Sequence, residues 1–594
     1  MGPAAKTEKT ASVLLEAVFL AAVIVLLRGY VWPTLSSVEV SVLQAKLDPA
    51  LFTRDFVVQE SLQFTPRFYY NALILLLARA GLPLAAAFGV WQFVAVGAIV
   101  TGLRAVAREL GLGATAAAAL VVWMLTVSVG TLGDVYFYTH APVPAVWAGA
   151  AVAWGAVFAL RGRWRLAFAL FGAAALLQFL VGFYAGLLAL PVWWFLAKGR
   201  DPVAPALWAL GLALVYVPMR LSGGTGSGLL SAEEFVTIYA QLRHPHHLVP
   251  STWSWAFWLQ SALFYGGAWW FLRKHPGNRP ATENFVLNTT ILLVVAALAA
   301  NWLFVEVWPT AWMATLQPAR ITPLVQGIVL ALLARRVHAR AVERDWAGAA
   351  LLGLIPLSLF PGFLLVVAAA LPLPARKRWS AYHAVLAVAV LLAFQPFDPS
   401  IAARGLRYGL WLALFVALVG TAWLAAKPGR LALATALALV GLGGAARASR
   451  SPSWPVFLQD RFAVDASPTG PEGRLGAHFN ANSPADTVVL TPPSDNAWLF
   501  RLHARRASVV EDKDFPFTER GMLTWRDRMS RVLGKKVMPG LDLTSAWAAR
   551  SPAELAAIAK EFGADYILTR DVWHPQLPGV PVDRDQGWTL WKLR

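Results

Sequence analysis

The sequence contains no cysteine, and only 14% of its 594 residues are charged. Without cysteine the chain can form no disulfide and offers no thiolate, which excludes cysteine-ligated metal centres and cysteine nucleophiles. A soluble domain averages about 25% charged and roughly 45–50% apolar residues. Here 58% are hydrophobic and the mean hydropathy is +0.55. The scarcity of charge therefore indicates a membrane protein.

The apolar residues are unevenly distributed. Residues 12 to about 447 form a succession of apolar runs separated by short basic stretches, whereas the chain from about 450 reads as an ordinary soluble sequence. We therefore predict an all-α polytopic membrane domain over residues 1–449, with about 13–15 transmembrane helices. A small soluble α/β domain is predicted over residues 450–594.

Acidic residues are also scarce, at 33 against 51 Lys and Arg, which gives a net charge of +18. From residue 450 onward the two signs nearly balance, with 19 basic and 17 acidic residues. The excess thus belongs to the membrane domain, where basic residues cluster at particular helix ends, as in Arg161–Arg165. This is the pattern of the positive-inside rule and argues against a nucleic-acid partner. The first apolar run, Ser12–Leu27, has no convincing cleavage site after it, so we expect a retained helix.

The basic clusters place the N-terminus in the cytoplasm. The outer-face loops are then residues 32–82, 133–141, 220–253 and 305–321, and the C-terminal domain is exoplasmic. Whether residues 68–80 form a short span is left open. The outer loops collect the polar residues that we single out as candidates: Asp48, Asp55, His140, Arg243, His244, His246, His247, Glu306, Gln317 and Arg320.

Each of these candidates has an alternative interpretation. Asp48 before Pro49 fits a helix N-cap with proline at the first position, and Asp55 fits a merely solvated side chain. The three histidines of QLRHPHHLVP, residues 241–250, fit an ordinary loop, a metal site or a phosphate site. Arg320 fits either a bidentate anion ligand or a snorkelling anchor at the membrane interface.

With these segments in place, the chain resembles the GT-C superfamily of membrane glycosyltransferases, and in particular a group of bacterial GT-C-like membrane proteins. The stretches that carry the resemblance are LDPALFTRDFVV, RHPHHLVPS, LQPARIT, TPPSDNAWLFRLHARRASVVEDKDFPF and TWRDR. They are spread over most of the chain, and the C-terminal stretch is the most distinctive.

The resemblance implies transfer of a sugar from a polyprenyl-phosphate-linked donor to a glycan, lipid or protein acceptor at the outer face of a bacterial plasma membrane. A carboxylate of the first outer loop would act as the catalytic base, for which Asp55 is preferred and Asp48 is the reserve. Arg320 and the histidine loop would neutralise the phosphate leaving group.

The sequence departs from the superfamily in one respect. Many GT-C enzymes carry adjacent acids or an acid-x-acid pair in the first loop, whereas Asp48 and Asp55 stand seven positions apart. No cofactor is therefore implied with certainty, and a divalent cation stays open. Two rival functions also stay open: a polytopic transporter or flippase of lipid-linked glycans, and a non-catalytic binding protein.

The C-terminal domain shows local signals of both strands and helices. Strands are predicted at residues 487–490, 507–510, 565–568 and 588–591. Ser551-Pro-Ala-Glu554 is a capping box that starts a helix ending at Gly563. A second helix is predicted over Met522–Leu533. The turn at residues 491–495, followed by Arg501, Arg505 and Arg506, could bind an acidic or sugar ligand, and the alternative is a structural lid over the membrane site.

Overall fold

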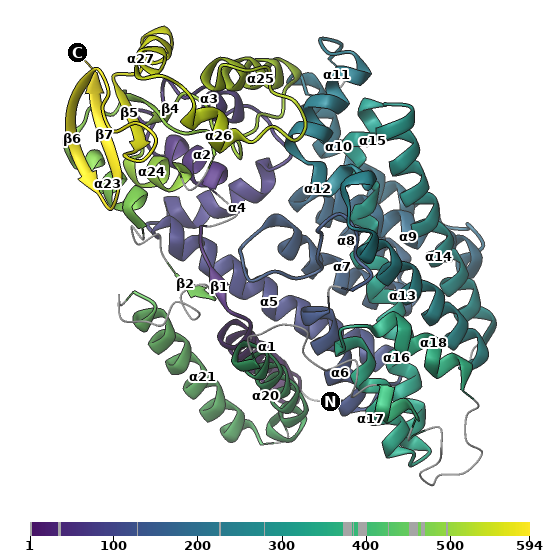
Figure 1. Ribbon diagram of the computed structural model, residues 1–594. Coiled ribbons are helices and arrows are strands. Elements are labelled where there is room, and N and C mark those ends of the chain that lie inside the picture. The colour runs from purple at the N-terminus through teal and green to yellow at the C-terminus, as the bar shows by residue number, and fades with distance from the viewer. Residues whose placement is uncertain are drawn as a thin grey trace.

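A computed structural model describes residues 3–33, 37–127, 129–224, 227–277, 280–371, 383, 385–389, 401–425, 427–450, 461–464, 470–494 and 497–593. Helices make up most of the chain as far as residue 448, and a sheet lies near the C-terminus (Figure 1). The predicted class, a helical membrane region followed by a small α/β unit, is confirmed.

The helical region has the following elements in chain order. They are α1 (Pro3–Arg28), α2 (Ser37–Leu47), α3 (Phe56–Ser61), α4 (Phe68–Arg79), α5 (Leu84–Glu109), α6 (Ala114–Thr126), α7 (Pro144–Leu160), α8 (Trp164–Leu177), α9 (Phe179–Ala197), α10 (Val203–Leu221), α11 (Ala232–Val236), the π-helix η1 (Thr237–Arg243), α12 (Pro245–Leu248), the 3-10 helix η2 (Pro250–Thr252), α13 (Trp255–Lys274), α14 (Pro280–Trp302), the π-helix η3 (Leu303–Val307), α15 (Ala311–Leu316), the 3-10 helix η4 (Pro318–Ile321), α16 (Thr322–Val342), α17 (Trp346–Leu354), the 3-10 helix η5 (Ile355–Leu357), α18 (Pro361–Ala370), α20 (Ile401–Ala425) and α21 (Pro428–Ala448).

Seven helical segments among the described residues are long and apolar enough to cross a membrane. They are Leu84–Glu109, Phe179–Ala197, Val203–Leu221, Pro280–Val307, Ala311–Val342, Leu406–Ala425 and Gly429–Ala448. Several other apolar helices are only 10–17 residues long, and a straight span needs about 20 residues. The expected total of 13–15 transmembrane helices therefore stays a prediction. Residues 68–80, left open above, contain the short helix α4.

Small residues set the closest helix contacts. A Cβ atom added to Gly211 of α10 would lie 2.4 Å from the Cα of Gly172 in α8, and one added to Gly155 of α7 would lie 2.4 Å from the ring of Phe171. Helices in a membrane gain little from burying apolar surface against one another, so close backbone approach and dense packing hold them together. Glycine at these crossings allows α7, α8 and α10 to pack as one layer.

The C-terminal region contains β2 (Phe462–Ala463), α23 (Gly470–Asn482), β3 (Val488–Leu490), α24 (Ala497–Ala504), β4 (Ala507–Ser508), α25 (Glu519–Leu533), α26 (Leu543–Ala548), α27 (Pro552–Glu561), β5 (Tyr566–Arg570), β6 (Gly579–Asp585) and β7 (Trp588–Leu593). Five strands form one sheet in the order β4-β3-β5-β7-β6. The first three are parallel, and β7 and β6 join as an antiparallel hairpin.

The four predicted C-terminal strands coincide with β3, β4, β5 and β7. Helix α27 starts at the predicted capping box, in which Ser551 accepts from the backbone of Glu554, and Gly563 follows its end with φ +63°. The helix predicted from Met522 begins three residues earlier, as α25. Helices α23, α24 and α26 and strand β6 were not predicted, because short amphipathic segments carry weak periodic signals.

The C-terminal sheet and its helices lie at one end of the molecule, beside α2, α3 and α4 (Figure 1). Strand β1 (Tyr30–Val31), which follows α1, pairs in parallel with β2 and connects the first helix to the start of the C-terminal region. Helix α25 contacts both α3 and η1. Three segments that are distant in sequence therefore meet at this end.

Candidate functional site

A cavity of about 760 Å³ lies where the helical region meets the C-terminal region. We call it the basic cavity. Its walls come from α2, the start of α4, α9, α10, η1, α15 and η4, together with residues 513–522. Its polar lining residues are Glu39, Arg67, Gln178, Arg220, Tyr239, Arg243, His244, Thr310, Thr315, Gln317, Arg320 and Lys513. Its apolar wall includes Val215, Tyr216, Met219, Trp312 and Phe515.

The cavity carries an excess of positive charge. Four arginines and Lys513 line it, and Glu39 is the single carboxylate among the described lining residues. Glu39 is nearly buried and forms an ion pair with Arg67 at 2.8 Å. Desolvated guanidinium groups are costly unless an anion compensates them. The unbalanced charge therefore favours an anionic ligand.

Arg320 is held by a chain of hydrogen bonds. Its Nε atom donates to the side-chain oxygen of Gln317, whose amide nitrogen donates to the hydroxyl of Tyr239 at 2.7 Å. Gln317 is buried and has φ +47°, a left-handed conformation that ends α15 and turns its side chain into this chain of contacts. No carboxylate of the described residues pairs with Arg320, so its remaining N–H groups are available to a ligand.

Arg243 ends the π-helix η1 and lies against the C-terminal region. Its Nη2 atom donates to the carbonyl of Lys513 at 2.9 Å, and its Nε is buried without a hydrogen-bond partner among the described residues. Burial lowers the pKa of Arg243, and the charge of Asp512 opposes that shift without forming a direct ion pair. Within the described part of the chain, this is a second guanidinium that forms no direct ion pair with a carboxylate.

The histidine loop forms the short helix α12, with Pro245 at its first position. Of its three imidazoles, only His244 lines the basic cavity, where its ring contacts Tyr239 and Phe515. Burial, followed by the charge of Arg243, holds the pKa of His244 well below its usual value. A neutral ring can share a hydrogen bond with a ligand but adds no charge.

The other two histidines lie outside the cavity lining. His247 Nδ1 lies 2.6 Å from the carbonyl of Gly133 and therefore carries the proton of that hydrogen bond. Burial lowers the pKa of His247 to about 4. His246 is exposed, and its ring packs on that of His247 at 4.0 Å. His247 therefore fastens α12 to the loop at residue 133.

The predicted acids also lie outside the cavity lining. Asp48 is exposed and follows the end of α2, where it accepts from the backbone of Ala50 in a turn. The alternative that Asp48 starts a helix is thus wrong, because the helix precedes it. Glu306 accepts from the backbone of Ser251 at 2.7 Å and closes a loop.

Asp55, the preferred base, is 1% exposed. It is the N-cap of α3, accepting from Val58 at 3.0 Å. It also accepts two hydrogen bonds from the guanidinium of Arg501. The alternative that Asp55 is merely solvated is therefore wrong. Arg501 and Arg506, considered above as ligands for an acidic molecule, are internal instead, since Arg506 bonds to Asn480 and Ser483.

His140 lies elsewhere in the molecule. Its carbonyl accepts from Val31 in β1 at 3.2 Å. Burial, with the charges of Arg28 and Arg461, lowers the pKa of its ring. It is therefore not part of the basic cavity.

Sequence reasoning missed Glu39, Arg67, Tyr239 and Lys513 as cavity residues. Lys513 lies within the C-terminal stretch that is the most distinctive part of the resemblance. Glu39 and Arg67 lie in the expected first outer loop but are 28 positions apart, so no local motif joins them. Among the described residues, no group of three His, Cys, Asp or Glu side chains could hold a metal ion.

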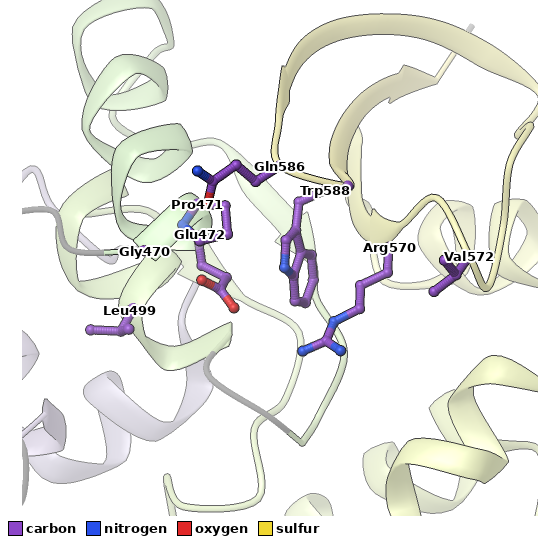
Figure 2. Close-up of a pocket in the computed structure, with 9 residues that line it drawn as sticks. Gly470, Pro471, Glu472, Leu499, Arg570, Val572, Gln586 and Trp588 are labelled. Carbon is purple, nitrogen blue, oxygen red and sulfur yellow. The ribbon is translucent and has the colours of Figure 1, made fainter.

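A second pocket, of about 630 Å³, lies in the C-terminal region between the start of α23 and the β6–β7 turn (Figure 2). The guanidinium of Arg570 lies over the rings of both Trp573 and Trp588, at 4.8 and 4.9 Å from the ring centroids. Trp588 is only 3% exposed, so its ring packs internally and presents little surface to a ligand. The basic cavity is therefore the stronger candidate site.

Comparisons with known proteins identify no close relative. A family model described as "Domain of unknown function (DUF6798)" matches residues 471–532. No curated protein matches the sequence. Among solved structures, the chain is similar to ArnT from Cupriavidus metallidurans bound to undecaprenyl phosphate, at 15% identity and a TM-score of 0.39, covering 99% of this chain and 97% of that chain.

Proposed function

We propose that the protein transfers a sugar from a polyprenyl-phosphate-linked donor to an acceptor, with the basic cavity as its site at the outer face of the membrane. One observation carries the proposal. Arg243 and Arg320 face one cavity, and neither forms an ion pair with a carboxylate of the described residues. The planar fork of a guanidinium group can donate two parallel hydrogen bonds to the oxygens of a phosphate group.

The charge of the cavity suits the bond that breaks. The donor is a phosphodiester with one negative charge. When the bond between the anomeric carbon and the phosphate oxygen breaks, its electron pair goes to that oxygen. The leaving phosphate monoester then carries about −1.5 to −2 charges. Two guanidinium groups therefore interact more strongly with the leaving group than with the donor, which is the requirement for catalysis.

The apolar wall suits a lipid substrate. Val215, Tyr216 and Met219 of α10 line the cavity, and so does Trp312 of α15. Tyr216 and Trp312 are about half exposed, on helical segments long and apolar enough to cross a membrane. A prenyl chain can leave the cavity between them into the bilayer while the phosphate stays against the arginines.

The base that activates the acceptor is assigned to Glu39 within this proposal. It would take the proton of the acceptor hydroxyl as the oxygen attacks the anomeric carbon. Glu39 lines the cavity, and its ion pair with Arg67 holds the carboxylate in one orientation. Neither Asp55 nor Asp48 lines the basic cavity. For either of them to act as the base, the substrate would have to bind elsewhere.

The test uses purified protein in lipid nanodiscs and has two measurements. The first is the affinity for polyprenyl phosphate, which should fall at least tenfold in Arg320→Gln and in Arg243→Gln. The second is sugar turnover from polyprenyl-phosphate-linked donors, which Glu39→Gln should abolish while sparing lipid affinity. Glu306→Gln, outside the cavity, is the matched control. If the wild type binds no polyprenyl phosphate, the proposed substrate class is wrong.

One observation favours transport of a lipid-linked glycan as the second candidate. A further cavity, of about 600 Å³, is lined by residues of α9 between 185 and 192 and of α16 between 324 and 335. The basic cavity lies close to it along the chain, because it is lined by Leu180 of α9 and by Arg320, which precedes α16. Between them the hydroxyl of buried Tyr184 donates to the carbonyl of Leu316 at 2.8 Å. Movement of a labelled polyprenyl-phosphate sugar between leaflets of proteoliposomes, without sugar transfer, would select this candidate.

A further inference from the structure

Residues 511–517 connect a buried ionic cluster of the C-terminal region to the basic cavity. Asp514 forms an ion pair with Arg501 of α24, and both side chains are almost completely buried. The neighbours of Asp514 face the other way, since Lys513 and Phe515 line the cavity. The position of the ion pair therefore fixes how far Lys513 and Phe515 extend into the cavity.

Arg501 is the centre of the cluster. Its Nε and Nη2 atoms donate to one oxygen of Asp55 at 3.0 and 2.9 Å, and its Nη1 pairs with Asp514. The same oxygen of Asp55 accepts from the backbone of Ser508 at 3.2 Å, while the other accepts from Val58. Asp55 is therefore fully engaged in joining the start of α3 to the C-terminal region.

The cavity side of residues 511–517 is held as well. Arg243 donates to the carbonyl of Lys513. The ring of Phe515 contacts those of Tyr239, His244 and Trp525, with centroids 5.1–6.1 Å apart. The segment is thus fixed between the ion pair on one side and a cavity-lining cluster on the other.

We propose that Asp55 and Arg501 are positioning residues that hold Lys513 and Phe515 in the wall of the basic cavity. The assignment of a phosphate-bearing lipid to that cavity rests on the proposed function, whereas the placement of the wall does not. Asp55 then acts on ligand binding through Arg501 and Asp514, with no proton transfer of its own.

The charges support this connection. Asp55, Asp514 and Glu511 are three buried carboxylates, and Arg501 is the guanidinium between the first two. Arg528 of α25 adds a second positive charge near Asp55, with its guanidinium over the ring of Phe56. Removing the charge of Asp55 weakens the hydrogen bonds that orient the guanidinium of Arg501. Because the interactions of a buried polar network strengthen one another, the ion pair of Arg501 with Asp514 weakens as well.

A matched control exists on the same interface. Arg54, next to Asp55 in sequence, donates to the carbonyl of Gly563 at 2.9 Å. This hydrogen bond also ties the start of α3 to the C-terminal region. Among the described residues, no hydrogen bond or ion pair joins the Arg54 side chain to residues 511–517. Arg54→Ala therefore loosens the interface without touching the proposed connection.

The first experiment is hydrogen–deuterium exchange of the full chain in nanodiscs without ligand. Asp55→Asn should speed amide exchange in residues 511–517 at least tenfold, and Arg54→Ala should leave that segment unchanged. If Asp55→Asn fails to fold, Arg501→Lys replaces it, because lysine keeps the charge but cannot form the two-pronged contact with Asp55. Unchanged exchange in 511–517 would overturn the proposal whether or not any lipid binds.

The second experiment is a double-mutant cycle read as affinity for polyprenyl phosphate. Asp55→Asn and Lys513→Gln should each weaken binding about tenfold, and the double variant should be little worse than either single one. Arg54→Ala combined with Lys513→Gln should be additive. Additive losses for Asp55 and Lys513 would contradict the proposal. A wild type that binds no polyprenyl phosphate, with exchange still altered, would reject the proposed function and leave the positioning role standing.

Discussion

The side-chain amide of Gln317 donates a 2.7 Å hydrogen bond to Tyr239 while its oxygen accepts from Arg320. One side chain thus links a residue of η1 to a residue of η4 in the lining of the basic cavity. The orientation of Arg320 depends on this link, because it is the one hydrogen bond that the guanidinium makes with the described residues.

Gln317→Met should therefore weaken polyprenyl-phosphate binding by about tenfold, or roughly 1.4 kcal/mol. Methionine keeps the length of the side chain but can neither donate to Tyr239 nor accept strongly from Arg320. Titration of the lipid against protein in nanodiscs measures the loss. An affinity equal to that of the wild type would show that Arg320 is oriented by other contacts.

Arg501→Met should destabilise the C-terminal region strongly. The substitution leaves Asp55 and Asp514 buried without their counter-ion, and breaking such a pair costs about 3–5 kcal/mol. Thermal unfolding followed by tryptophan fluorescence measures the effect. Arg474→Met is the control, because the Arg474–Asp585 pair is exposed and should contribute about 1 kcal/mol or less. Equal losses in the two variants would contradict the assignment.

Glu511 should make stability depend on pH. Burial raises its pKa to about 7 from an ordinary value near 4.5, with Asp55 adding to the shift and Arg501 opposing it. The folded state therefore holds a proton that the unfolded state has released between those two values. Stability should fall as pH rises from about 4.5 to 7 and then stay level, with a total loss of about 3 kcal/mol.

Glu511→Gln removes the ionisable group and tests this directly. The variant should match the wild type near pH 4.5 and exceed it in unfolding temperature at pH 8. Unfolding followed at several pH values in one buffer series measures the difference. If the two proteins keep a constant difference across the range, Glu511 does not titrate as described.

Gly211→Val should prevent normal assembly of the helical region. Its first side-chain atom would lie 2.4 Å from the Cα of Gly172, and neither backbone can retreat without breaking the contact of α8 with α10. Gly266→Ala is the control, since the space beside Gly266 is open. The yield of monodisperse protein after detergent extraction should fall for Gly211→Val and stay unchanged for Gly266→Ala.

Local signals in the sequence predicted elements that depend on neighbouring residues. The apolar runs predicted the long helices, and the Ser551–Glu554 capping box predicted the start of α27. These elements need only hydrogen bonds and burial within a few residues. Within the candidate site, Arg243, His244, Gln317 and Arg320 were predicted because they are polar residues of the expected outer-face loops, and all four line the basic cavity.

The remaining site residues could not be predicted in the same way. Asp55 was singled out as a carboxylate in an expected outer loop, but its partner Arg501 lies 446 positions away. No local sequence pattern marked Glu39 as a site residue, because its ion-pair partner Arg67 comes near it only in the folded structure. An acid can be exposed, a helix cap, an ion-pair member or a base with the same local sequence, because its surroundings decide its role.

By itself, the sequence determined that this is a helical membrane protein with a small α/β unit after it, since composition and periodicity follow from which residues prefer water. Only the tertiary structure decided which charges meet. Arg501 joins Asp55 to Asp514, and Arg243 and Arg320 face one cavity without an ion-pair partner among the carboxylates that the structure describes. The reason is physical: hydrophobic burial is a property of each residue, whereas electrostatic interactions depend on distances between residues far apart in the chain.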